Sequence, residues 1–446
     1  MKELIELDKK HFIHPTSSIQ LQQESGAKLI IEKGDGIYLT NMDGRVFIDA
    51  MSSLWNVNIG HGRKEMAEVA MEQMNKLGYS SAFSSFSNEP AIRLAKKISD
   101  LSPPKLNAVF FTSGGSQSND SAIKLVRHYC EIQGHPERNK IILLKRGYHG
   151  VVAGAKSTTD ISEYWEMDEH TKTSFAHAEN PYEIGTSRSL ASIREEIEKV
   201  GSETVAAFLA EPVQGTGGVL IPPSDYFQEV RKLCDEYGIL FIADEVITGF
   251  GRTGKMFGIE HWDVEPDLIT FAKGVTSGYF PLGGVIMSDE IHNVLKDKSH
   301  GILFQGFTNS GHPTAAAVAL KNIDIIETEG LVENAKKMGE ELLKGLIEVK
   351  HKTRIVGDVR TIGLLGAMEF LHDPISPQNL KLAPRVVEAL HVRGVICRAV
   401  TFDGCDILCF SPPLIINKEQ IKTLTKKLTE SIKSVEQELA SQLLKL

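Results

Sequence analysis

The chain has 446 residues, 41% hydrophobic and 24% charged, a composition typical of a globular protein too long for one small core. Its net charge is −9, and no basic cluster resembles a nucleic-acid-binding surface. Because the charged start lacks the apolar core of a signal peptide and no stretch approaches a membrane span, we expect a cytoplasmic protein without membrane contact.

The N-terminal region begins with a hairpin pattern over 34–49 that has Asp43-Gly44 at its turn, followed by an amphipathic helix over 64–77. Apolar runs then alternate with helical segments. Six such runs are expected as strands: 107–111, 140–144, 205–210, 239–243, 268–272 and 283–287. Strands that are apolar on both faces and separated by helices predict a mostly parallel sheet with helices on both faces.

The C-terminal region returns to helical periodicity and then mixes strands with helices. Its expected elements are helices over 313–328 and 331–350, strands over 392–398 and 406–410, and terminal helices over 417–445. This mixture predicts a smaller α+β domain. We therefore expect three parts: an N-terminal segment packing with the small domain (1–60), a large domain (61–330) and a C-terminal small domain (331–446).

Two of the expected strands end in an ionisable residue. Lys273 follows the apolar run 268–272, and Asp244 follows 239–243. The carboxyl end of a parallel strand is where open sheets bind ligands. A lysine there is suited to react with a carbonyl, and an aspartate to hold a cation; pyridoxal phosphate needs both. Either residue alone is more often part of a solvated face or a turn, and the pair becomes informative only together with a phosphate site and an aromatic residue.

The run 112–120 is rich in glycine and serine and joins an expected strand, 108–111, to an expected helix, 121–133. Backbone N–H groups at such a helix start form a phosphate site, to which Ser116 would add a hydroxyl; a plain capped turn is the alternative. Tyr148, followed by His149, comes after another strand. Its ring can stack on a flat ligand or pack on the core.

The segment 249–255 fits both GxGxxG and GxxxxGK, which are nucleotide-binding patterns. Its glycines begin five residues after the strand end at Asp244, however, and Gly258 prevents a helix from opening cleanly. Met256 stands where Ser or Thr would bind magnesium. We interpret this segment as a structural loop.

Three further observations bear on a site. Thr308 precedes an expected helix and is a second candidate phosphate donor. Arg398 can bind a carboxylate or sulfonate, or form a surface ion pair. The five scattered cysteines include no CxxC motif, so we expect neither a disulfide framework nor a metal site.

Taken together, these residues resemble the class III aminotransferases, a branch of the fold type I pyridoxal-phosphate enzymes. The resemblance covers nearly the whole chain and is densest over 240–254 and 266–278. It implies the fold type I architecture: a mostly parallel large-domain sheet covered by helices on both faces, plus a smaller α+β domain. It also implies a homodimer with shared active sites, or a tetramer built from such dimers.

The resemblance assigns roles to individual residues. Lys273 would form the Schiff base with the cofactor and move the proton, and Asp244 would pair with the ring nitrogen. The remaining cofactor contacts would come from Val246 and Tyr148 on the two ring faces, from His149, and from Gly115, Ser116 and a neighbouring subunit's Thr308 at the phosphate. Leu54, Trp55 and Arg398 would line the substrate pocket, with Glu211 as the partner of Arg398 when no substrate anion is present.

The substrate expectation rests on which arginine is present. Family members that use ornithine or γ-aminobutyrate carry an arginine where this chain has Cys409, before Phe410. Arg398 instead matches the mobile arginine of ω-amino acid–pyruvate aminotransferases, and the taurine–pyruvate and β-alanine–pyruvate types are the most similar. Gln117-Ser118 and Asn309 depart from the common family pattern, which leaves the amine donor open.

The resemblance therefore predicts a ping-pong transamination that moves the terminal amine of taurine, β-alanine or a γ-aminobutyrate-like compound to a 2-oxo acid, most simply pyruvate. A 2-oxoglutarate/glutamate enzyme, or a racemase, mutase or decarboxylase on the same fold, remains an alternative. So does an NAD- or ATP-dependent enzyme that uses 249–255. A non-catalytic protein would not need Lys273 and Asp244.

Overall fold

The computed structural model describes residues 2–165, 174–299, 302–371 and 381–443. Its central feature is a seven-stranded sheet with the order β4-β10-β9-β8-β7-β5-β6. The strands, in that order, are Leu106–Thr112, Gly283–Ser288, Leu268–Phe271, Leu240–Asp244, Val205–Ala210, Lys140–Leu144 and Phe175–Ala178. Only β10 runs antiparallel to its neighbours, which confirms the mostly parallel sheet. The edge strand β6 was not predicted.

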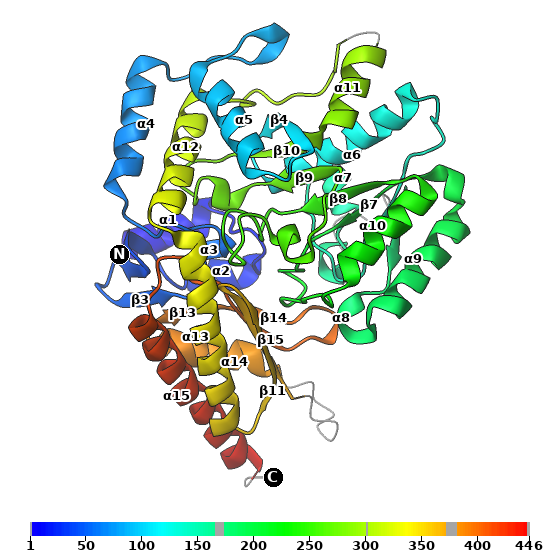
Figure 1. Ribbon diagram of the computed structural model, residues 1–446. Helices are drawn as coiled ribbons and strands as arrows, with labels where there is room; N and C mark the ends of the chain where they lie inside the picture. The colour runs from blue at the N-terminus through cyan, green and yellow to red at the C-terminus, as the bar shows by residue number, and fades with distance from the viewer. Residues whose placement is uncertain (1, 166–173, 300–301, 372–380, 444–446) are drawn as a thin grey trace.

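Helices cover both faces of this sheet, because alternate residues of each strand point to opposite sides. Ile141 and Leu143 of β5 pack with α6, whereas Ile142 and Leu144 belong to the apolar core on the other face. The helices of the two layers are α6 (Gly115–Ile132) with α11 (Asp289–Lys298) on one side, and α5 (Glu89–Leu101), α9 (Thr186–Val200), α10 (Tyr226–Tyr237) and α12 (Pro313–Thr328) on the other. Figure 1 shows these helices around the sheet.

The N-terminal hairpin has the expected form and joins a strand from near the C-terminus. The strands β1 (Ile31–Asp35), β2 (Tyr38–Asn41) and β3 (Val46–Asp49) pair antiparallel, with Asp43-Gly44 between β2 and β3. Strand β3 then pairs in parallel with β13 (Val395–Ile396). The first 50 residues are therefore anchored to the C-terminal region, a connection between distant parts of the chain that local periodicity does not show.

A third sheet lies beside the seven-stranded one, below it in Figure 1. Its order is β11-β12-β15-β14, from Val356–Ile362, Leu365–Phe370, Ile407–Phe410 and Arg398–Val400. The helices of this region are α13 (Leu331–Lys352), α14 (Leu382–Val392) and α15 (Lys418–Leu443). From the pairing of β3 with β13, we propose that 1–60 belongs with the small domain 331–446, and that 61–330 is the large domain.

The remaining helices include α4, which spans Lys64–Lys76 as expected to within one residue. The shorter ones are α1 (Lys2–His11), α2 (Ile19–Ser25), α3 (Ser52–Trp55), α7 (Ala153–Lys156) and α8 (Pro181–Ile184). Across the described ranges, no helix is both long and apolar enough to cross a membrane.

Candidate active site

The carboxyl ends of the parallel strands lie along one edge of the seven-stranded sheet. Strand β8 ends in Asp244, β9 is followed closely by Lys273, and β7 is followed directly by Glu211. The loop after β5 carries Tyr148, and the turn after β4 leads to Gly115. Five residues singled out from the sequence thus come from five strands to one edge, which is the position where open α/β sheets bind ligands.

Asp244 is buried, with 3% of its surface exposed, and its two oxygens differ. Oδ2 accepts hydrogen bonds from Nδ1 of His149 at 2.7 Å and from Nδ2 of Asn119 at 2.8 Å. Oδ1 accepts one hydrogen bond, from the backbone N–H of Val246 at 3.0 Å. Because each carboxylate oxygen can accept about two hydrogen bonds, Oδ1 keeps a lone pair for a further donor.

Asn119, in the second turn of α6, holds this arrangement and was missed by sequence reasoning. Its Nδ2 also donates to the carbonyl of His149 at 2.8 Å, and its Oδ1 accepts from the hydroxyl of Thr270 at 2.8 Å. The only sequence signal is an asparagine that shares a helix with buried apolar residues. Its partners lie more than a hundred residues away, in β8 and β9, apart from His149.

Lys273 stands at the same edge with an amine that is easily deprotonated. Burial lowers its pKa to about 8, against the opposing effect of the Asp244 and Glu211 charges, and the positive charge of Arg398 lowers it further. Among the described residues no carboxylate lies within ion-pair distance of its amine. Its backbone has φ of +44°, a strained conformation of the kind found at functional sites. A neutral amine in this position is a nucleophile for a carbonyl.

The start of α6 provides an anion site, although its boundary differs from the expected one. The helix begins at Gly115 rather than at 121, so Ser116 lies in its first turn. The serines and Gln117 of the run are accommodated because they bond locally; Gln117, for example, accepts from the N–H of Ser113 at 2.9 Å. A Cβ added at Gly114 would meet no atom within 4 Å, so open space lies before free N–H groups.

Residues of two loops contact the start of α6. A Cβ at Gly115 would lie 2.8 Å from Cγ1 of Val246, which places Val246 directly against the glycine. The hydroxyl of Ser116 accepts from the N–H of Val151 at 3.2 Å. The sheet edge therefore combines an amine, a carboxylate with a free lone pair, an apolar surface and an anion site.

Glu211 does not pair with Arg398 as the resemblance had implied. Its Oε1 accepts from the backbone N–H of Tyr148 at 3.0 Å and its Oε2 from that of Gly215 at 2.9 Å. Burial raises its pKa to about 7, against the opposing effects of His149 and of these two backbone hydrogen bonds. Burial also raises the pKa of Tyr148 to about 12, which keeps its ring neutral.

Arg398 reaches the site from β14 of the third sheet. Its guanidinium lies 4.9 Å from the centre of the Trp55 ring, and within the described ranges it forms neither a hydrogen bond nor an ion pair. Trp55 is buried, with 2% exposed, whereas Leu54 is 52% exposed. The segment is strained: Ser52, Ser53 and Trp55 all have φ between 45° and 57°.

Thr308 lies on the surface, outside any helix or strand. Its carbonyl accepts from the hydroxyl of Tyr79 at 2.8 Å. Two residues on, Ser310 donates to the carbonyl of Phe111 at 2.8 Å, at the end of β4. An exposed position beside this end of the sheet is compatible with a contribution to a neighbouring subunit.

The loop 249–255 is structural, as interpreted from the sequence. No α-helix opens directly after its glycines, where only a short 3-10 helix, Gly258–Trp262, follows, and Arg252 is fully buried. The guanidinium donates to four acceptors from the N-terminal segment and the C-terminal region: the carbonyls of Leu364 and Pro412, Oγ of Ser52 and Oδ1 of Asn58. Through Arg252 this loop connects the N-terminal segment to the C-terminal region.

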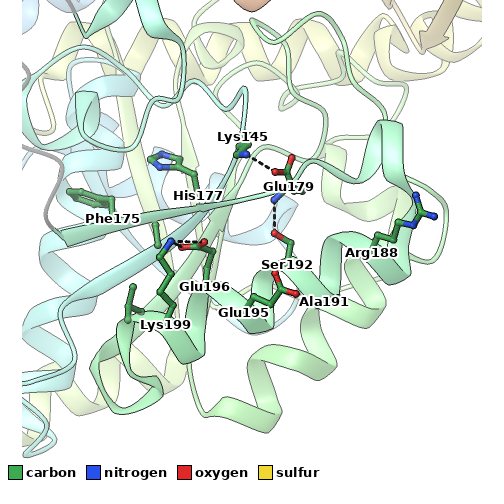
Figure 2. Close-up of a pocket in the computed structure, with 12 residues that line it drawn as sticks. Lys145, Phe175, His177, Glu179, Arg188, Ala191, Ser192, Glu195, Glu196 and Lys199 are labelled. Carbon is green, nitrogen blue, oxygen red and sulfur yellow. Dashed lines mark hydrogen bonds and ion pairs between the residues drawn. The ribbon is translucent and has the colours of Figure 1, made fainter.

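A separate surface hollow of about 750 Å³ lies between β6 and α9 (Figure 2). None of the catalytic candidates lines it. Its charges are largely paired with one another, as in Lys145–Glu179 at 2.5 Å and Lys199–Glu196 at 2.9 Å. We assign it no ligand.

Lys273, Asp244 and the open start of α6 fit pyridoxal phosphate, which needs an amine for its aldehyde, a carboxylate for its ring nitrogen and a site for its phosphate. The fold and this site define a fold type I pyridoxal-phosphate enzyme. The family model Aminotransferase class-III matches residues 20–432. The chain belongs to this family, and it is a transaminase that depends on pyridoxal phosphate.

Relatives and solved structures agree with this assignment. A transaminase structure from the marine bacterium Virgibacillus is 62% identical, with a TM-score of 0.96, and the match covers 98% of this chain and 100% of that one. The putrescine–pyruvate aminotransferase of Pseudomonas aeruginosa is 37% identical over 94% of this chain and 93% of its own length. The diaminobutyrate–2-oxoglutarate transaminase of Halomonas elongata is also 37% identical, over 97% and 96%.

Proposed function

We propose that this transaminase moves the terminal amine of an ω-amino acid, such as β-alanine, taurine or γ-aminobutyrate, to pyruvate in a ping-pong reaction. The amine donor becomes an aldehyde, and pyruvate becomes alanine. The observation that carries the proposal is the free guanidinium of Arg398, stacked on Trp55 without a carboxylate partner among the described residues. An unpaired cation at the rim of a site suits an acid group at the far end of a substrate.

The bound cofactor supplies the aldehyde that receives amines and a ring that takes up the electrons of a broken C–H bond. Lys273 would hold it covalently and, once displaced by substrate, carry the proton on its Nζ. Oδ1 of Asp244 would accept a hydrogen bond from the ring nitrogen and keep that nitrogen protonated. Val246 and Tyr148 would contact the two faces of the ring, and His149 would hold Asp244 in place through their hydrogen bond.

The phosphate would be bound by Gly115 and Ser116 at the start of α6, with Thr308 added by a second subunit. We propose a homodimer with shared sites. In support, the segment containing Thr308 carries exposed apolar side chains, including Ile302 at 74% and Phe304 at 91%, and Phe86 is 70% exposed. Large exposed apolar groups of this kind mark surfaces that pack against another chain.

The substrate acid group would meet Arg398, while Trp55 and Leu54 would bound the pocket. Cys409 lies opposite Arg398 in the pairing of β14 with β15, so no second cation stands there. One arginine serving donor and acceptor in turn is consistent with a ping-pong reaction. The second candidate acceptor is 2-oxoglutarate, which is favoured by the similarity to the Halomonas enzyme.

The proposal is tested by a panel of donors (β-alanine, taurine, γ-aminobutyrate, putrescine and glutamate) against both acceptors, with the products identified. We expect fast transfer from the ω-amino acids to pyruvate and slow transfer from glutamate. A strong preference for glutamate would refute the proposed acid-group recognition. Turnover of an amino acid without an acceptor would instead indicate a racemase or decarboxylase.

A further inference from the structure

Glu211 is hydrogen-bonded to the backbone of the site and, in the described part of the chain, is not paired with a charged side chain. Both of its oxygens accept backbone hydrogen bonds, from Tyr148 at 3.0 Å and from Gly215 at 2.9 Å, and only 4% of its surface is exposed. The ionisable groups that act on it most are His149 and Asp244, at the base of the site. A carboxylate bound this way is occupied whether or not a substrate anion is present.

The hydrogen bonds of Glu211 belong to a wider connection between two loops. Nε2 of Gln214 donates to the carbonyl of Lys145 at 3.1 Å, and a guanidinium nitrogen of Arg146 donates to the carbonyl of Gly217 at 2.6 Å. Together with the bond from Tyr148 to Glu211, three contacts join the loop after β5 to the loop after β7. Glu211 is the contact that directly restrains the backbone of Tyr148.

The ring of Tyr148 is the starting point of a series of aromatic contacts. It lies 5.3 Å from the ring of Tyr164, which lies 6.1 Å from the ring of Phe402. Phe402 follows β14, the strand that carries Arg398. A shift of Tyr148 would therefore disturb both the surface facing the cofactor ring and the packing beside the strand of the substrate arginine.

We infer that Glu211 is a positioning residue that fixes Tyr148 over the cofactor, and that Arg398 binds substrate acid groups without exchanging partners with Glu211. The inference rests on the proposed function for the roles of Tyr148 and Arg398. If Arg398 has no resident carboxylate partner, it has no ion pair to break before it binds the acid group of a substrate.

The test compares Glu211→Gln with the matched control Glu245→Gln in the full-length protein as purified. Glu245 is also fully buried and accepts two backbone hydrogen bonds, from Gly258 at 2.8 Å and Ile259 at 2.7 Å, but it does not contact Tyr148. In Glu211→Gln an amide nitrogen would replace one acceptor. Because the remaining amide oxygen can face either donor, amide hydrogen exchange at Tyr148 or at Gly215 should accelerate about tenfold, as expected for the loss of one hydrogen bond. The control should leave that exchange unchanged.

A kinetic comparison separates positioning from charge pairing. Glu211→Gln should lower kcat about tenfold or more for β-alanine and for propylamine alike, because misplacing a group in the site affects both. If Glu211 were the partner of Arg398, the variant would free the arginine and favour β-alanine selectively. Glu211→Asp, which keeps one acceptor within reach, should partly restore both activities.

Unchanged exchange at both Tyr148 and Gly215 in folded Glu211→Gln, or a change in kcat/KM confined to β-alanine, would overturn the inference. The exchange measurement does not depend on the substrate. Failure of the proposed function would appear as absent transfer from β-alanine in the unmodified enzyme, with the exchange result intact.

Discussion

Asp244 and His149 are joined by a 2.7 Å hydrogen bond at the base of the site, between two side chains that are almost fully buried. This hydrogen bond is made to Oδ2, which also accepts from Asn119, so that among the described residues Oδ1 accepts only from the N–H of Val246 and keeps a lone pair. A carboxylate that already accepts three hydrogen bonds therefore keeps an acceptor for the proposed hydrogen bond from the cofactor ring nitrogen.

Replacing Asp244 by Asn should keep the shape of the side chain but remove the charge that we propose holds the ring nitrogen protonated. We expect kcat to fall about a hundredfold or more, since a fixed charge at the reacting group is lost. Absorbance spectra and steady-state rates would measure this. Asp49→Asn is the matched control for the spectrum, because Asp49 is also buried and bonded to a histidine, His61, at 2.8 Å. A normal rate in Asp244→Asn would contradict the assignment.

Arg398→Leu should weaken reactions of substrates that carry an acid group. Loss of a charge-assisted hydrogen bond is worth about 1.5–3 kcal/mol, so kcat/KM for β-alanine should fall roughly tenfold to a hundredfold. Propylamine, which lacks the acid group, should change by less than about twofold as a donor when the acceptor is saturating. Equal losses for both donors would show that Arg398 acts on the fold rather than on the acid group.

The lowered pKa of Lys273 predicts how the rate of cofactor binding depends on pH. Burial lowers it from 10.5 to about 8, so the amine is charged below that pH and nucleophilic above it. Recapture of pyridoxal phosphate by cofactor-free protein should therefore quicken as pH rises through about 8. Stopped-flow absorbance measures the rate, with N-acetyl-lysine amide as the reference amine. A midpoint near that of the reference would show that the site does not shift the lysine.

Arg252→Met should destabilise the protein, because it leaves the acceptors that Arg252 now contacts buried and unsatisfied. We expect a loss of about 3 kcal/mol or more in the free energy of unfolding, measured by urea titration. Arg194→Met, which removes an exposed ion pair with Glu236, should change little. The same loop, 249–255, is interpreted as structural. If the unmodified protein bound ATP through these residues, that interpretation would be wrong.

Six of the seven strands of the large sheet in the described residues could be predicted from the sequence. The positions of Lys273 and Asp244 at the carboxyl ends of two strands could be predicted because a buried strand has a strong apolar signal. The edge strand β6, Phe175–Ala178, was missed because its four residues, Phe-Ala-His-Ala, contain a histidine and two alanines and so give a weak apolar signal. The start of α6 was placed six residues late, because serines and glycines have low helix propensity that packing and local hydrogen bonds override.

Long-range polar contacts could not be predicted. Asn119 meets Asp244 and Thr270 only after the sheet has formed, and nothing local distinguishes it from a capping residue. The same holds for Glu211, whose resemblance-based pairing with Arg398 is replaced by bonds to backbone N–H groups. Local pattern identifies residue positions along strands, whereas the partners of a buried polar group depend on the assembled fold.

The most direct test of the account is borohydride reduction of the purified protein with its cofactor, followed by peptide mapping by mass spectrometry. The account predicts a single pyridoxyl-phosphate label on the ε-amine of Lys273, and no label in Lys273→Ala. Attachment to another lysine, or full transamination by Lys273→Ala, would contradict it.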